Sequence, residues 1–276
     1  MKTELKKVIV SNIGRIIDQK AEYVDVRFHE DDNSETICLY DGDLEINDTV
    51  FERGLGVRVL YGGAWGFAAT SNLLNINGCF DQAYINAVTA SKLIKIPLTM
   101  GKRDGHISSY SSPVKTDPFE VKLDTKLDFL FKLDEQLKAD FVKQRRIDTT
   151  FQKKNVHIFN SEGTEINRNL TNTFATMQIK GMDKDNEMQS RSKYMFTSGK
   201  GTRGFEMLIQ PELFSSNADR IKSELSSLLA ADSLNFEERS VILLPGQGFL
   251  QVHETIGHPL ELDRILGYEL SYAGGS

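Results

Sequence analysis

The order in which apolar residues repeat along the chain restricts the fold more than any other feature. Apolar side chains recur at helical spacing over residues 5–17. Strand-like runs follow, at residues 23–29, 35–40, 44–47, 56–61 and 64–69. The sequences Asp-Gly-Asp at 41–43 and Gly-Gly at 62–63 are typical of hairpin turns. Helical spacing returns over 80–94, so a helix, an antiparallel meander and a second helix predict an α+β fold.

The same order recurs after a segment rich in proline, glycine and serine at 97–118, which is typical of a long loop or a domain boundary. Helical spacing over 123–141 precedes a second antiparallel meander at 147–194, with turns expected at 161–163 and 180–181. A fourth helix is expected to begin near Pro211. We therefore expect two α+β domains, at residues 1–113 and 114–232.

Residues 233–276 have a different character. An apolar strand is predicted at 240–244, ended by Pro245 and two glycines, and a short helical stretch follows. About 40 residues cannot easily bury a core of their own. We therefore interpret 233–276 as the opening of a third domain, the remainder of which is missing from this chain.

Charge and cysteine content limit the class of protein. The 33 basic and 39 acidic side chains give a net charge of −6, which argues against a dedicated nucleic-acid surface. Two cysteines, Cys38 and Cys79, cannot form a disulfide framework and favour a reducing compartment. No stretch approaches the ~20 apolar residues of a membrane span, and the amino terminus lacks the apolar run of a signal peptide. We expect a soluble, cytoplasmic protein.

The pattern H-E-x-x-x-H at residues 253–258 is the candidate for chemistry. In zinc peptidases with H-E-x-x-H, the i, i+4 spacing places both histidines on one helix face. Here the spacing is i, i+5, which in a regular helix places His258 roughly 140° away from His253. Pro259 and Gly257 disfavour a regular helix at this point, so we expect the helix to unwind at Gly257 and bring His258 back. Glu254 would then face the metal. Two partly buried histidines with ordinary hydrogen bonds are the alternative.

Residues 252–263 resemble the signature of the TldD/PmbA family of metallopeptidases, in its TldD-like branch that carries HExxxH. In that family the motif is followed by Leu-Glu and an acidic residue, as Leu260, Glu261 and Asp263 follow here. The layout is also similar to the family's: an N-terminal α+β domain, a middle domain, and a β-rich catalytic domain opened by the HExxxH helix. The resemblance extends over the whole chain and is strongest over 241–276.

The resemblance implies a zinc-dependent peptidase. In this role His253 and His258 are zinc ligands and Glu254 is the general base that activates water. Glu261 and Asp263 either orient the two histidines or lie as ordinary carboxylates at a helix end.

The resemblance also implies a third zinc ligand, a cysteine far downstream, and this chain ends before any such position. Cys38 and Cys79 do not match it, and we interpret both as small buried residues. We expect this chain to be an inactive fragment with weak or absent metal binding. The resemblance implies unfolded peptides as substrates and a homo- or heterodimer with a TldD- or PmbA-like subunit.

Two other interpretations stay open. A non-catalytic scaffold or partner subunit is the alternative function, because PmbA-like subunits lack the motif.

The glycine-dense strands at 53–56 and 61–66 favour tight turns and close packing, and they also fit a peptide-docking edge. The pattern G-x-G-x-x-G at 199–204 matches a dinucleotide fingerprint, but a strand rather than a helix is expected at 205–209, so a hairpin loop explains it better.

Overall fold

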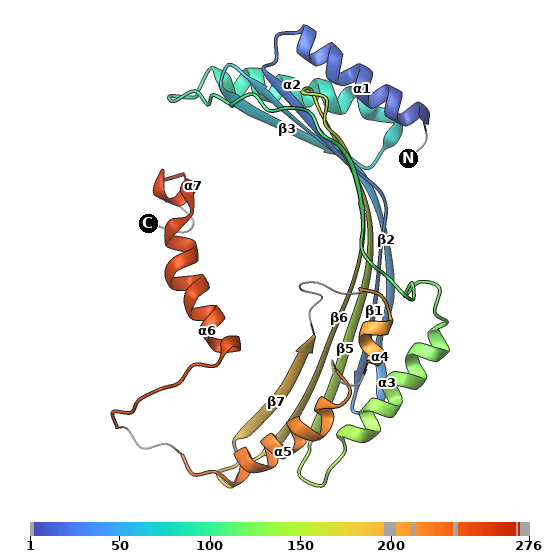
Figure 1. Ribbon diagram of the computed structural model, residues 1–276, viewed down its shortest axis with the longest axis vertical. Coiled ribbons are helices and arrows are strands. Elements are labelled where there is room, and N and C mark those ends of the chain that lie inside the picture. Colours follow the sequence, from blue (N-terminus) through green and yellow to red (C-terminus); the bar gives the residue numbers. More distant parts are fainter. Residues whose placement is uncertain (1–2, 196–202, 211–213, 234–236, 269, 271–276) are drawn as a thin grey trace. The chain divides into compact units, whose positions relative to one another are not determined.

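The computed structural model describes residues 3–195, 203–210, 214–233, 237–268 and 270 (Figure 1). The chain divides into two compact units, Met1–Ala231 and Asp232–Ser276. The expected combination of helices and antiparallel sheet is confirmed. The domain boundary at residue 113 stays a prediction. None of the helices in these described ranges is both long enough and apolar enough to cross a membrane.

The first unit is built on a seven-stranded sheet in the order β3-β2-β1-β5-β6-β4, with β7 also paired to β6. All pairs are antiparallel except β4 with β6. The strands are β1 (Tyr23–Tyr40), β2 (Asp43–Tyr61), β3 (Ala64–Thr70), β4 (Ile107–Ser111), β5 (Gln144–Asn160), β6 (Glu165–Met182) and β7 (Met188–Met195). The two expected meanders are therefore joined, because β1 pairs with β2 on one side and β5 on the other.

Several strands are longer than the sequence suggested. The runs at 23–29 and 35–40 belong to one strand, β1, whose register shifts between His29 and Asp32 accommodate the polar residues between them. The turn at 161–163 is confirmed between β5 and β6. The turn expected at 180–181 is wrong, because both residues pair with β7. The chain turns instead after Asp183, whose carboxylate accepts the N–H groups of Asp185 and Glu187.

Helices α1 (Thr3–Asp18) and α2 (Ile76–Ser91) cover one face of β1, β2 and β3 (Figure 1). Alternate residues of β1 and β2 point into this core, as period-two burial requires. The buried set includes Ile9, Ile13, Ile16, Val24, Val26, Phe28, Val57, Val59, Phe80 and Ala83. Gly66 of β3 lies directly against α2, because a Cβ there would be 2.2 Å from the Ala83 carbonyl oxygen and 2.2 Å from the Ala87 nitrogen. A short 3-10 turn, Leu73–Asn75, leads into α2.

A second core lies where α3 (Leu123–Leu137), α4 (Glu206–Ile209) and α5 (Asn217–Ala230) pack on β1, β5 and β6. Within it, Lys126 is 2% exposed, forms an ion pair with Glu35, and lies 4.8 Å from the ring centroid of Phe151. Instead of the strand expected at 205–209, residues 206–209 form helix α4 and Phe205 is its N-cap. Pro211 and most of the glycine-rich segment 199–204 lie outside the described residues.

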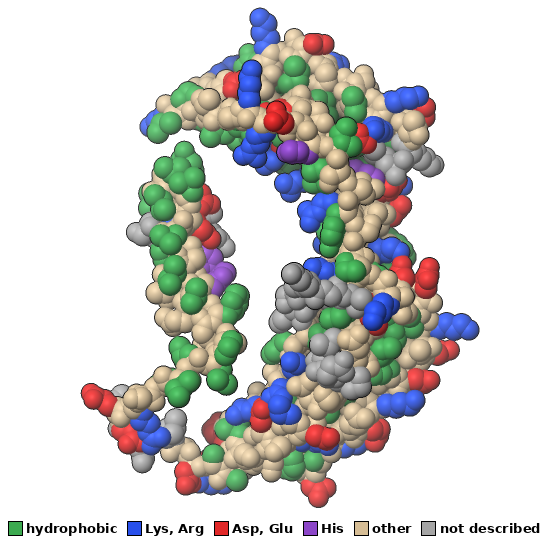
Figure 2. Space-filling view, in the orientation of Figure 1, with side chains coloured by type: hydrophobic (Ala, Val, Ile, Leu, Met, Phe, Trp, Pro, Cys, Tyr) green, Lys and Arg blue, Asp and Glu red, His purple; other side chains and the backbone are tan. Residues whose placement is uncertain are grey.

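The second unit consists of short helical segments: α6 (Pro245–Val252), a π turn (His253–Gly257), a 3-10 turn (His258–Leu260) and α7 (Leu262–Ile265). The strand expected at 240–244 is wrong. The described part of this unit contains no strand that could pair with it, and Ile242 is 89% exposed. None of the unit's described residues is buried, and Figure 2 shows hydrophobic side chains spread over its surface.

We predict that Gly66→Ala destabilises the first unit, because the added methyl group would collide with the backbone of α2. The expected loss is about 1–3 kcal/mol, as for other overpacked sites, and thermal unfolding followed by circular dichroism measures it. Gly14→Ala is the matched control, since nothing lies within 4 Å of a Cβ at that exposed position of α1. This control should be neutral or stabilising by about 0.5–1 kcal/mol.

Candidate metal centre

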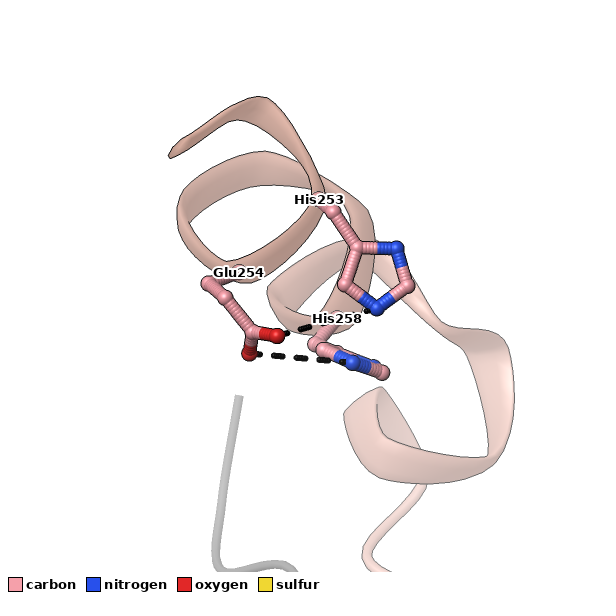
Figure 3. A group of neighbouring side chains, drawn as sticks. All are labelled: His253, Glu254 and His258. Carbon is pink, nitrogen blue, oxygen red and sulfur yellow. Dashed lines mark ion pairs between the residues drawn. The ribbon is translucent and has the colours of Figure 1, made fainter. Parts of the chain in front are cut away.

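The two histidines and the glutamate of the HExxxH sequence come together in the second unit (Figure 3). One ligand atom from each of His253, Glu254 and His258 can be chosen so that all three atoms lie within 4.8 Å of one another. The two imidazole rings are 4.4 Å apart between centroids and nearly perpendicular, at 81°. The Glu254 carboxylate lies 3.8 Å from Nε2 of each ring. The sequence therefore identified a group of side chains that is close in space.

A π turn produces this arrangement. The backbone N–H of His258 donates to the carbonyl of His253, which is the i→i+5 hydrogen bond of a π-helix. This wider turn places residues i and i+5 on the same face of the helix, as an α-helical turn does for residues i and i+4. The expected unwinding at Gly257 is wrong, since Gly257 (φ −59°, ψ −61°) and His258 (φ −62°, ψ −43°) both keep right-handed helical angles.

Glu261 and Asp263 differ in what they contact. The Glu261 carboxylate lies 2.9 Å from Nδ1 of His258, and Glu261 itself is extended (ψ 128°), so the helix stops there. In a neutral imidazole this contact places the proton on Nδ1 and leaves Nε2 as the free ligand atom. The Asp263 carboxylate instead accepts the backbone N–H of Arg264, 2.9 Å away. Only Glu261 contacts one of the two histidines.

The side chains of the group suit a divalent transition metal. Imidazole nitrogen and carboxylate oxygen are ordinary Zn²⁺ ligands. The His253 side chain is 46% exposed, that of Glu254 58%, and that of His258 32%, so each can turn towards a shared ion without breaking a core contact. With Glu254 kept as a base, the two histidines supply two of the three protein ligands that a catalytic zinc site uses.

The two cysteines are poor metal ligands in the folded chain. Both are buried in the first unit. Burial, together with hydrogen bonds to the carboxylates of Asp148 and Glu45, raises the pKa of the Cys38 thiol to about 12. Burial also raises the pKa of Cys79. Because metals bind the thiolate, both groups are in the wrong protonation state at neutral pH.

Two protein-family descriptions match this chain, and both matches lie in the first unit. Residues 24–87 match the family description "PmbA/TldA metallopeptidase domain 1", and residues 116–224 match "PmbA/TldA metallopeptidase central domain". The HExxxH residues lie outside both matched ranges. Together the matches span more than half of the chain.

Curated relatives and solved structures are similar over most of this chain. Metalloprotease MJ0996 of Methanocaldococcus jannaschii is 26% identical over 89% of the chain, and a metalloprotease of Methanothermobacter thermautotrophicus is 22% identical over 91%. The chain spans about half the length of these relatives, 53% of each. Among structures, a candidate modulator of DNA gyrase from Thermotoga maritima has a TM-score of 0.64 at 20% identity (84% of this chain, 49% of that one). TldE from Thermococcus kodakarensis has a TM-score of 0.56 at 12% sequence identity, and the match covers 79% of this chain and 47% of TldE.

We predict that Glu261→Gln, in the longest gene product that contains these residues, weakens metal binding by about 10–100-fold, because the amide no longer fixes the proton on Nδ1 of His258. Titration with Co²⁺, followed by its visible absorption, measures the affinity. Asp263→Asn is the matched control, since the Asp263 carboxylate accepts the backbone N–H of Arg264 and, among the described residues, has no ion pair with either histidine. Equal losses in the two variants would contradict the assigned role of Glu261.

We also predict that neither thiol reacts with a disulfide reagent at pH 8 in the folded protein, because the raised pKa values of Cys38 and Cys79 keep both protonated. In denaturant both should react, giving 2 thiols per chain. Absorbance of the released thiolate measures the count. Rapid reaction of the folded chain would show that at least one cysteine is accessible as thiolate.

Proposed function

Because the chain belongs to the PmbA/TldD family of metallopeptidases, we propose that it carries the metal-binding segment of a zinc-dependent peptidase that hydrolyses unfolded peptides. The observation that carries this proposal is the convergence of His253, Glu254 and His258 on one turn of helix. The relatives named metalloprotease support it.

Each residue has a distinct part in this proposal. Nε2 of His253 and of His258 would hold Zn²⁺, and Glu261 would keep the His258 ring in the correct tautomer. The bound ion supplies Lewis-acid chemistry, which polarises the scissile carbonyl and makes water more acidic. Glu254, whose oxygens lie 3.8 Å from both rings, would accept the proton of the attacking water. The same carboxyl group would then donate it to the leaving amine.

Among the described residues, the group that could hold a metal here consists of His253, Glu254 and His258. We propose that a third ligand, a cysteine, comes from polypeptide beyond this chain, and that the chain by itself is inactive. We further propose a cytoplasmic enzyme and a dimer with a TldD- or PmbA-like subunit. A non-catalytic scaffold is the competing proposal, since a segment without all its ligands would behave as one.

Metal content separates the two proposals. We expect the longest gene product that contains these residues to carry one zinc per chain, measured by atomic emission. His253→Ala and His258→Ala should each lose most of this zinc, because each removes a ligand. Glu254→Gln should keep the zinc and lose peptide hydrolysis by at least about 100-fold, as expected for loss of a general base.

The scaffold proposal makes the opposite forecast. Zinc content would then be unchanged in His253→Ala, and no peptidase activity would accompany it. Asp263→Asn is the matched control for folding of this segment, and it should retain both zinc and activity.

A further inference from the structure

The face of β1, β2 and β3 that α1 and α2 leave uncovered contains a hollow. Across the strands, Asp25 pairs with Arg58 and Arg58 with Phe67; in the next row Arg27 pairs with Gly56 and Gly56 with Ala69. His29 and Gly54 form the row after that. A pocket of about 730 Å³, within the range of small-ligand sites, is lined by Arg27, His29, Gly54, Gly56, Phe67 and Ala69, together with the end of β3.

The floor of this hollow is bare backbone. Gly54 and Gly56 are successive residues on the same face of β2, so the middle strand has no side chain there. A Cβ on Gly56 would lie 3.3 Å from the ring of Phe67, which therefore leans over this position. Glycines within a strand often mark a close approach of a ligand or of another backbone. The hollow thus has a flat peptide floor with Phe67, which is 58% exposed, as one wall.

Arg27 forms the opposite wall. Among the described residues it has no ion pair, although the carboxylates nearby do. Asp25 binds the Arg58 guanidinium at 2.5 Å, and Asp32 binds Nδ1 of His29 at 2.6 Å. Glu52 and Arg53 also line the hollow and offset each other in charge. The Arg27 guanidinium therefore suits a carboxylate in two-point contact.

We propose that this hollow binds the carboxyl-terminal residue of an unfolded peptide. The terminal carboxylate contacts Arg27, the peptide backbone lies on Gly54 and Gly56, and an apolar terminal side chain packs on Phe67. The biological meaning of this site rests on the proposed peptidase function, in which it would hold a peptide by its end. Binding itself needs no metal and uses only residues of the first unit.

Trp65 provides a built-in reporter. It is the one tryptophan of the chain, lies two residues from Phe67 on the same face of β3, and is 36% exposed. Its ring contacts the Arg58 guanidinium at 5.1 Å from the centroid. The probe is N-acetyl-Ala-Ala-Leu with a free carboxyl group, compared with the same tripeptide as its amide. Equilibrium dialysis measures the same binding if the fluorescence of Trp65 does not change.

The free acid should bind saturably and at least about 10-fold more tightly than the amide, as expected for one charge-assisted contact. Arg27→Gln should remove this preference, whereas Arg168→Gln, an exposed arginine on β6, should preserve it. Phe67→Ala should weaken both ligands, and so should Gly54→Ala, which raises the floor where a Cβ has only ordinary contacts.

Equal binding of acid and amide, or full binding by Arg27→Gln, would overturn the proposal. Absence of binding in both assays would do so as well. His253→Ala should bind the tripeptide like the unaltered chain. Failure of the metal site and failure of this hollow are therefore observed separately.

Discussion

The pairing of β1 with strands on both sides is the constraint on which the first unit depends. This one strand contributes Val24, Val26 and Phe28 to the core under α1 and α2, and Ile37 and Leu39 to the core under α3 and α5. Its 18 residues pair with β2 and with β5 along most of their length. The two helical layers therefore share one sheet, and a change in the register of β1 would affect both cores.

The candidate metal centre depends on a local backbone feature instead. One i→i+5 hydrogen bond from His258 to His253 gives the turn its extra residue and places both imidazoles on one side. Without it, a regular helix would separate the rings by roughly 140°. Glu261, three residues after His258, then fixes the orientation of that ring at 2.9 Å. The second unit thus positions its candidate ligands by backbone geometry, because its described residues bury no core.

The two candidate sites differ in how their residues are brought together. The HExxxH group collects side chains from one stretch of six residues, 253–258, so its members could be found by spacing. The hollow on β1, β2 and β3 combines residues of three strands, and two of its main features are glycines that contribute no side chain. Only strand register places Arg27 beside Gly56 and Gly56 beside Ala69.

The sequence by itself determined the helices with clear 3.6-residue periodicity, the hairpin turns at 41–43 and 62–63, and the identity of His253, Glu254 and His258 as one group. Local periodicity and turn chemistry are properties of neighbouring residues, so they can be derived without the fold. Tertiary structure decided the rest. It joined two meanders into one sheet through β1, and residues 240–244 formed no strand. It also replaced an expected break at Gly257 by a π turn, because each of these outcomes depends on which backbone groups find hydrogen-bond partners.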